Sequence, residues 1–185
     1  MEAVTLTALR SSRVLAVGTG VRIAIAPAIM ALVLDRSYTP AAVVFVAAAA
    51  TDWFDGRLAR RWGVTTRLGS FLDTTADKLL VSTALIALVA IHRASPWVAL
   101  VIIAREFTIL GLRTAIVAEG RAFQTSMLGK WKATVQFAAV TLAILRPDVT
   151  FGDAFLDQWA MVAAAIVTGW SGIDYLVRSA AALRS

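Results

Sequence analysis

The sequence predicts an all-α integral membrane protein with six transmembrane helices. Of its 185 residues, 59% are hydrophobic and only 16% are charged, which leaves too much apolar surface for a soluble domain of this size. Apolar stretches of about 20 residues, the length that crosses a bilayer, recur along the whole chain. They lack the alternation of polar and apolar residues that is typical of membrane β-barrels.

Short polar breaks divide the apolar stretches into six segments. We expect spanning helices roughly over residues 14–34, 40–60, 71–91, 96–117, 127–145 and 157–177. The breaks leave no room for a second domain, so we expect residues 1–185 to form a single membrane domain. Ahead of the first stretch, Arg10 and Arg13 indicate that residues 1–13 form a short amphipathic segment on the membrane surface.

The basic residues are distributed unequally between the two sets of helix ends. One set holds Arg36, Arg93 and Arg146, beside an acidic loop with Asp148, Asp153 and Asp157 that we expect to be solvated. The other set holds Arg10, Arg13, Arg57, Arg60, Arg61, Arg67, Arg121, Lys130, Lys132, Arg178 and Arg184. The positive-inside rule therefore places both termini in the cytosol. The net charge of +6 favours anionic lipid as a partner, because no nucleic-acid-binding module is present.

Four aspartates lie inside two of the apolar segments. Asp52 and Asp55 are three residues apart, and Asp73 and Asp77 are four apart, so each pair shares one helix face. A rise of ~1.5 Å per residue places both pairs at a similar depth, ~10–14 Å below the cytosolic ends of their helices. We therefore expect the two pairs to converge near the cytosolic side of the membrane.

This cluster predicts a site for two divalent cations. Four carboxylates in a low-dielectric bundle repel one another unless cations compensate them, and two divalent ions balance their charge. The chain has no cysteine and a single histidine, so the ligands are oxygen atoms, which suit Mg²⁺ or Mn²⁺ rather than Zn²⁺. Paired ions of this kind often assist displacement at phosphorus, which indicates an enzyme of phosphoryl transfer.

Two alternatives remain open at this point. In the first, Arg57, Arg60, Arg67 and Lys78 neutralise the aspartates, and the network only fixes helix packing. In the second, the chain is a divalent-cation transporter, since acidic residues also line membrane ion pathways. The transporter fits less well, because the cluster lies toward one side of the membrane rather than at its midplane.

The motif D-x2-D-G-x2-A-R-x8-G-x3-D-x3-D resembles the signature of the CDP-alcohol phosphotransferases, membrane enzymes of phospholipid synthesis. Its eight fixed positions are Asp52, Asp55, Gly56, Ala59, Arg60, Gly69, Asp73 and Asp77. The resemblance implies a six-helix fold, usually homodimeric, with two metal ions on the aspartates. It also implies that small residues let the nucleotide approach the helices, and that CMP is the leaving group.

Roles within this site follow as hypotheses from the resemblance. Asp77 is expected to act as the general base, besides binding metal. The CDP moiety is expected to contact Asp52, Gly56, Ala59, Arg60, Arg67, Gly69 and Lys78. Among these, the three cationic side chains would balance the charge of the diphosphate.

A second group of basic residues predicts how the acceptor alcohol binds. Arg105, Arg113, Lys130 and Lys132 make a cationic wall that an anionic acceptor would need. The alternative is that Arg113 and the two lysines are interfacial anchors, and that Arg105 pairs with a carboxylate such as Glu106.

Several segments are similar to the bacterial phosphatidylglycerophosphate synthase branch of the family, which joins CDP-diacylglycerol to glycerol 3-phosphate. They are T-D-W-F-D-G-R-L-A-R-R-W, A-D-K-L-L, I-A-R-E-F-T-I-L-G-L-R and G-K-W-K-A-T-V-Q. Thr19 and Arg22 also match a Thr-x-x-Arg of the first helix. The likeness implies both substrates and a location in the bacterial cytoplasmic membrane. Related branches use phosphatidylglycerol or inositol phosphate as the acceptor.

Overall fold

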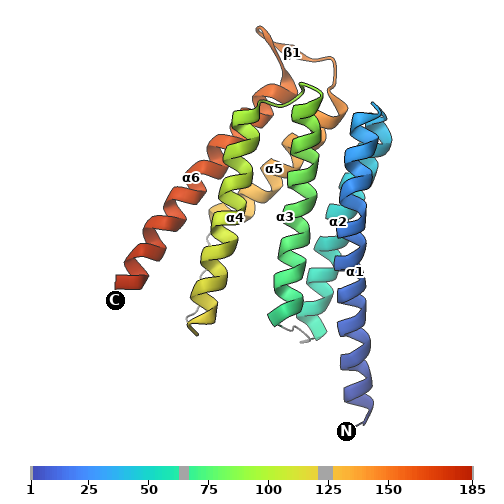
Figure 1. Ribbon diagram of the computed structural model, residues 1–185, viewed down its shortest axis with the longest axis vertical. Coiled ribbons are helices and arrows are strands. Elements are labelled where there is room, and N and C mark those ends of the chain that lie inside the picture. The colour runs from blue at the N-terminus through green and yellow to red at the C-terminus, as the bar shows by residue number, and fades with distance from the viewer. Residues whose placement is uncertain (1, 63–66, 121–126, 185) are drawn as a thin grey trace. The chain divides into compact units, whose positions relative to one another are not determined.

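The computed structural model describes residues 2–62, 67–120 and 127–184, and it describes side chains in 18–51, 69, 71–120 and 131–179. In that part of the chain the structure has six helices and two short strands (Figure 1). Their order is α1 (Glu2–Leu34), α2 (Tyr38–Trp62), α3 (Arg67–Ala90), α4 (Pro96–Ala118), α5 (Met127–Leu145), β1 (Thr150–Phe151), β2 (Ala154–Phe155) and α6 (Leu156–Arg184). The predicted all-α class is confirmed.

The chain divides into two compact units, Met1–Ala84 and Leu85–Ser185. The first unit holds α1, α2 and most of α3, whereas the second holds the end of α3 together with α4, α5, the hairpin and α6. The expected single membrane domain over residues 1–185 stays a prediction.

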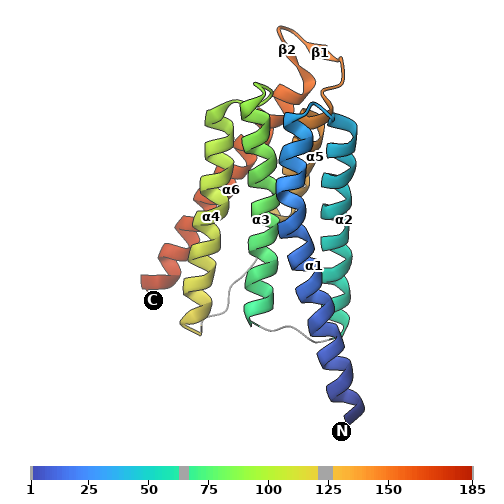
Figure 2. The ribbon, with the colours of Figure 1, turned by 45° about the vertical axis from the view of Figure 1, so that its right-hand side comes forward.

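In the first unit, α1 and α2 run in opposite directions and pack against each other (Figure 2). Fully buried apolar side chains recur at helical spacing on both helices, at Ala26, Ile29, Val33, Ala41, Phe45 and Ala48. Of the segment expected as a separate surface helix over residues 1–13, residues 2–13 are part of the continuous helix α1. Their position on a membrane surface stays a prediction.

Three helices are followed by a basic residue in the left-handed conformation. Arg36 has a φ of 63°, His92 of 58° and Arg146 of 43°, although glycine is the usual residue there. After α1, the Ser37 amide donates to the Leu32 carbonyl and the Arg36 amide to Val33, which is the Schellman pattern. Arg93 and His92 repeat it after α3, so these turns close the helix ends without glycine.

In the second unit, α6 packs against both α4 and α5, and it runs in the same direction as α4 and opposite to α5 (Figures 1 and 2). One half of its interior is apolar, with Ala139, Val140, Ala143, Ile144, Met161 and Ala164 buried. The other half, around the middle of α4 and of α6 and the first half of α5, buries polar side chains at Glu106, Lys132, Gln136, Thr168 and Ser171. Because burying charge is costly unless it is paired, this polar half is a candidate for function.

A short hairpin precedes α6 and corrects one expectation. Strands β1 and β2 pair in antiparallel register, with Thr150 opposite Phe155, and Gly152 in the turn has a φ of 63°. Asp157, which we expected in a solvated loop, is fully buried in the first turn of α6 and pairs with Arg146 at 3.1 Å. The sequence prediction was wrong here because spacing alone does not show that Arg146 lies beside Asp157.

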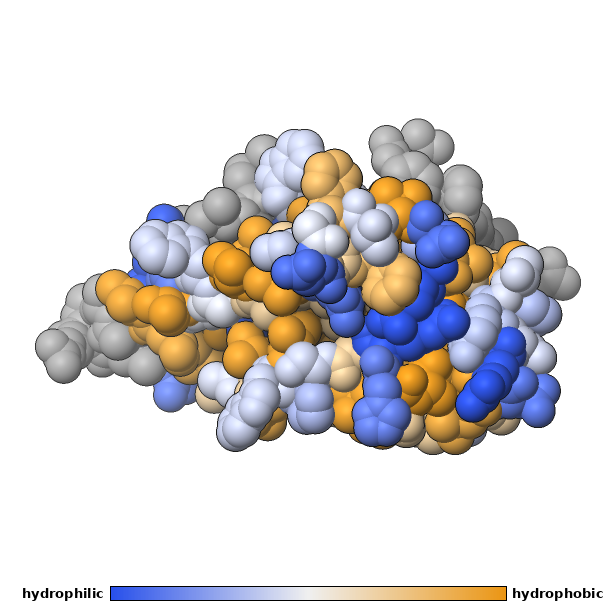
Figure 3. Space-filling view, turned by 90° about the horizontal axis from the view of Figure 1, so that it is seen from above, coloured by the Kyte–Doolittle hydropathy of each residue, from blue (hydrophilic) through white to orange (hydrophobic). Residues whose placement is uncertain are grey.

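Large apolar side chains are exposed on both units. On α6, Ile166, Trp170, Ile173 and Val177 are between 62% and 71% exposed. On the face seen from above, hydrophobic residues lie beside a central group of hydrophilic ones (Figure 3). Within the described residues, one helix, Leu156–Ser179, is long and apolar enough by itself to cross a membrane. Charged side chains interrupt α3 and α4. Six membrane spans therefore stay a prediction.

Candidate functional site

Two of the four predicted metal ligands, Asp73 and Asp77, lie one turn apart on α3. The Asp73 side chain is 38% exposed and that of Asp77 is 21% exposed, while Ala76 between them is fully buried. The two carboxylates therefore lie on an accessible part of the helix, beside a face that packs into the first unit.

Helix α1 supplies two partners for Asp73. The buried Arg22 donates from Nη1 to Oδ1 of Asp73 at 2.6 Å, and Thr19 Oγ1 donates to the same oxygen at 3.4 Å. These are the residues that matched the Thr-x-x-Arg pattern, to which the sequence assigned no contact. The structure shows that they hold one side of the Asp73 carboxylate.

Asp77 has a neighbour on its own helix. Lys78 Nζ donates to Oδ2 of Asp77 at 2.9 Å, and both side chains are about one-fifth exposed. The structure thus places Lys78, predicted to contact the diphosphate, beside the predicted general base. This pair is also one that the alternative of a structural ion-pair network predicts.

The remaining predicted residues of this cluster lie outside the described side chains. They are Asp52, Asp55, Gly56, Ala59 and Arg60 on α2, with Arg67 at the start of α3. The α2 backbone is helical at all five of these predicted site residues. Gly69 lies in the first turn of α3. Convergence of the four aspartates therefore stays a prediction.

The carboxylate oxygens of Asp73 and Asp77 suit a hard divalent cation. Oδ2 of Asp73 and Oδ1 of Asp77 have no hydrogen-bond partner within the described part of the chain, so each carboxylate keeps an oxygen for another ligand. Oxygen donors from carboxylates are what Mg²⁺ and Mn²⁺ prefer. Among the described side chains no three His, Cys, Asp or Glu residues form a group. Asp52 and Asp55 lie outside that set.

In the second unit, a buried carboxylate joins two of the four predicted acceptor-binding residues. Glu106 on α4 is 1% exposed, and its Oε1 accepts from Lys132 Nζ on α5 and from Arg105 Nη1 at 3.3 Å. The contact between Arg105 and Glu106 proposed as the alternative is thus confirmed. The structure brings Arg105 and Lys132 together around one negative charge.

Helix α6 fixes the position of the Arg105 side chain. Arg105 Nη2 donates to Ser171 Oγ at 3.0 Å, and a Cβ added to Gly172 would lie 2.8 Å from Arg105 Cγ. A glycine is needed at position 172 because the aliphatic part of Arg105 packs against its backbone.

Arg113 and Lys130 complete the predicted cationic wall. Arg113 is exposed on α4, and the Tyr175 hydroxyl group on α6 interacts electrostatically with both Arg105 and Arg113. The side chain of Lys130 lies outside the described residues. Arg105, Arg113 and Lys132 therefore all lie in the second unit, where the first two share Tyr175 as a neighbour.

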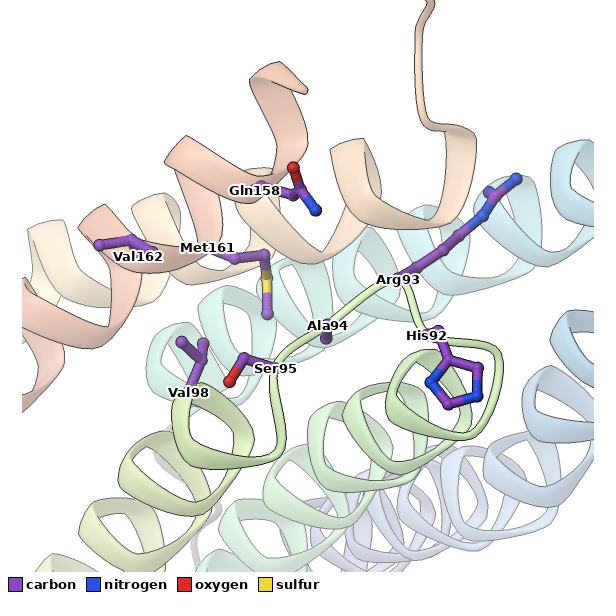
Figure 4. A pocket seen from close by; sticks show the side chains of 8 residues that line it. All are labelled: His92, Arg93, Ala94, Ser95, Val98, Gln158, Met161 and Val162. Atoms are coloured by element: carbon purple, nitrogen blue, oxygen red, sulfur yellow. The ribbon is translucent and has the colours of Figure 1, made fainter. Parts of the chain in front are cut away.

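A cavity of about 280 Å³ lies between the start of α4 and the start of α6 (Figure 4). Val98, Met161 and Val162 line it together with the polar side chains of Ser95 and Gln158. Arg93 points away from its centre and donates from Nη1 to the Ile144 carbonyl at 2.6 Å. None of the predicted site residues lines this cavity.

Comparison with known proteins gives a family match over most of the chain. Residues 16–170 match the family model described as CDP-alcohol phosphatidyltransferase. That range includes all eight fixed positions of the motif and the four residues of the cationic wall.

Curated relatives with one shared name cover most of the chain. A protein from Bacillus subtilis (strain 168) is 40% identical over 148 residues, which are 78% of this chain and 75% of the relative. Proteins from Sodalis glossinidius and Escherichia coli (strain K12) are 42% and 40% identical over 155 residues, or 80% of this chain and 84% of each relative. All three are named CDP-diacylglycerol–glycerol-3-phosphate 3-phosphatidyltransferase.

Proposed function

The chain belongs to the CDP-alcohol phosphatidyltransferase family, and on this premise we propose that it transfers a phosphatidyl group from CDP-diacylglycerol to the 1-hydroxyl of sn-glycerol 3-phosphate. The products are phosphatidylglycerophosphate and CMP. The observation that carries the proposal is the shared name of relatives that are 40–42% identical over about four-fifths of the chain. The cationic side chains in the second unit suit an acceptor that carries a phosphate.

Asp52, Asp55, Asp73 and Asp77 are the residues that would hold two Mg²⁺ or Mn²⁺ ions. Bound divalent ions supply Lewis-acid polarisation of the diphosphate and neutralise the charge that develops on the leaving CMP. Support comes from the accessible carboxylates of Asp73 and Asp77, each with one oxygen that makes no hydrogen bond to the described part of the chain.

The residues around the aspartates would bind and orient the nucleotide. Gly56, Ala59 and Gly69 have little or no side chain, so the CDP moiety can approach the helix backbones. Arg60, Arg67 and Lys78 would balance the diphosphate charge, with further contact from Asp52. Lys78 is suited to this role because it already lies beside Asp77.

Asp77 would serve as the general base. Its carboxylate takes the proton of the acceptor hydroxyl while that oxygen forms a bond to the β-phosphorus, and the bond between this phosphorus and the CMP oxygen breaks. Arg105, Arg113, Lys130 and Lys132 would hold the acceptor phosphate and so direct the hydroxyl group toward the donor.

The same proposal includes the membrane setting. The six helices would span the bacterial cytoplasmic membrane, with both termini and the active site on the cytosolic side, where the basic residues are concentrated. Exposed apolar side chains such as Trp170 and Ile173 on α6 suit contact with lipid or with a second copy in a homodimer.

The decisive measurement is CMP release by the purified protein given CDP-diacylglycerol, Mg²⁺ and one acceptor at a time. We expect product with glycerol 3-phosphate, and we expect Asp77→Asn to reduce kcat at least 100-fold, because general-base catalysis contributes about 10²–10⁴-fold. The control is Asp148→Asn, which changes an exposed carboxylate.

Other outcomes select other functions. Product only from phosphatidylglycerol would indicate a cardiolipin synthase, and product only from inositol phosphate would indicate that branch of the family. Divalent-cation flux in liposomes without CMP release would indicate a transporter. Any of these results would contradict the proposed acceptor.

A further inference from the structure

Glu106 is a buried carboxylate that the reaction itself does not use. It lies on α4 with 1% of its side chain exposed, and Lys132, whose Nζ it accepts from, is 4% exposed. Arg105, its second partner, is 12% exposed. A buried charge is stable only with a counter-charge and good hydrogen bonds. In this cluster Glu106 is the counter-charge and hydrogen-bond acceptor of Arg105 and Lys132.

The charges in this cluster do not cancel. Arg105 and Lys132 contribute two positive charges and Glu106 one negative charge, so the three side chains carry a net charge of +1. An ammonium or guanidinium group that is already held in place loses less conformational entropy when an anion binds. The cluster therefore keeps one positive charge in excess, which favours an anionic ligand such as a phosphate monoester.

Helix α6 contacts Arg105 as well. Ser171 accepts a hydrogen bond from Nη2 at 3.0 Å, and Gly172 leaves room for the aliphatic stem. Three helices therefore determine where the Arg105 guanidinium lies. Helix α4 carries Arg105, α5 supplies Lys132 to the shared Glu106 carboxylate, and α6 contacts Arg105 through Ser171 and Gly172.

We propose that Glu106 is a positioning residue for the acceptor phosphate, which acts by holding Lys132 and Arg105 in the geometry that binds it. The inference rests on the proposed function, because it assigns the phosphate of glycerol 3-phosphate to these two cations. Glu106 itself touches neither substrate. Its removal therefore weakens acceptor binding and leaves donor binding unchanged.

The test is the kinetic analysis of Glu106→Gln, which keeps the shape of the side chain and removes its charge. We expect the KM for glycerol 3-phosphate to rise about tenfold or more, the size that follows from losing hydrogen bonds to a charged group. The KM for CDP-diacylglycerol is expected to stay the same. Glu106→Asp, which keeps the charge, should recover part of the affinity, and Glu119→Gln on the exposed end of α4 is the control.

A second variant tests the same geometry without replacing Glu106, Arg105 or Lys132. Gly172→Ala places a methyl group against Arg105 Cγ, whereas Gly111→Ala adds one where nothing lies within 4 Å. We expect the first to raise the KM for glycerol 3-phosphate and the second to leave it unchanged. This comparison decides the question if Glu106→Gln fails to fold.

The outcomes separate the inference from the proposed function. An unchanged KM for glycerol 3-phosphate in Glu106→Gln would overturn the positioning role, as would an equal rise in both KM values together with a lower melting temperature, which is the mark of general structural damage. Failure of the wild-type protein to use glycerol 3-phosphate would overturn the proposed function instead.

Discussion

At the scale of single residues, the Arg22 and Asp73 pair links α1 to the predicted metal site. Arg22 is buried and contacts Oδ1 of Asp73 at 2.6 Å, with Thr19 on the same oxygen. A partner that holds one carboxylate oxygen orients the other, and residues with this role around metal sites affect affinity strongly. Arg22 is therefore expected to matter for metal binding although it is not a ligand.

Replacing Arg22 by Gln tests this role. We expect the Mg²⁺ concentration for half-maximal activity to rise roughly 10-fold or more, the range typical of residues that orient metal ligands. The measurement is a Mg²⁺ titration of CMP release, and Arg36→Gln in the exposed turn after α1 is the matched control. Identical titration curves for the two variants would show that Arg22 only fills space.

At the scale of elements, Arg146 and Asp157 join the end of α5 to the start of α6. Asp157 Oδ2 accepts from Arg146 Nε at 3.2 Å, and Arg146 Nη2 also donates to the Arg93 carbonyl at 3.4 Å. The guanidinium carbon lies 5.0 Å from the centre of the Phe155 ring, within cation–π range. One side chain thus connects α5, the hairpin, α6 and the turn after α3.

Asp157→Asn should destabilise the protein by about 2 kcal/mol, less than for a fully buried pair because Arg146 is 20% exposed. For a chain of this size that corresponds to a fall in Tm of roughly 4–8 °C, measured by thermal unfolding in detergent. Asp153→Asn, on the exposed hairpin turn, should leave Tm unchanged. Equal Tm values for the two variants would contradict a stabilising role for the pair.

The helices could be predicted from the sequence, whereas the contacts between them could not. The expected segments 96–117 and 127–145 agree almost residue for residue with Pro96–Ala118 and Met127–Leu145, because long apolar stretches are bounded by polar breaks. The burial of Asp157, by contrast, depends on which distant side chain lies next to it. The contact between Arg105 and Glu106 could be proposed from the sequence because the two residues are adjacent. The contacts of Ser171 and Gly172 with Arg105 could not.

At the scale of the whole molecule, the asymmetric distribution of basic residues remains the basis for the proposed orientation. The described helices agree with the number of expected spans, and the exposed apolar face of α6 suits lipid contact. Because the chain has no cysteine, single cysteines can report on each side of the membrane without background labelling.

Cysteine labelling in intact bacterial cells tests this orientation. We expect Asp153→Cys, in the hairpin turn, to react with a membrane-impermeant maleimide, and Glu119→Cys, at the end of α4, to react only after the cells are permeabilised. The extent of labelling is read on gels. Reaction of Glu119→Cys in intact cells would show that the opposite orientation, or a mixture, is present.

Apart from the Arg146–Asp157 pair, the second unit buries apolar side chains around Val140 and Met161 and polar ones around Glu106 and Lys132. The residues that would recognise substrate, around Glu106 and Lys132, are thus separate from those that pack closely, around Val140 and Met161. We therefore expect substitutions among the apolar side chains to change the stability of this unit more than its substrate preference.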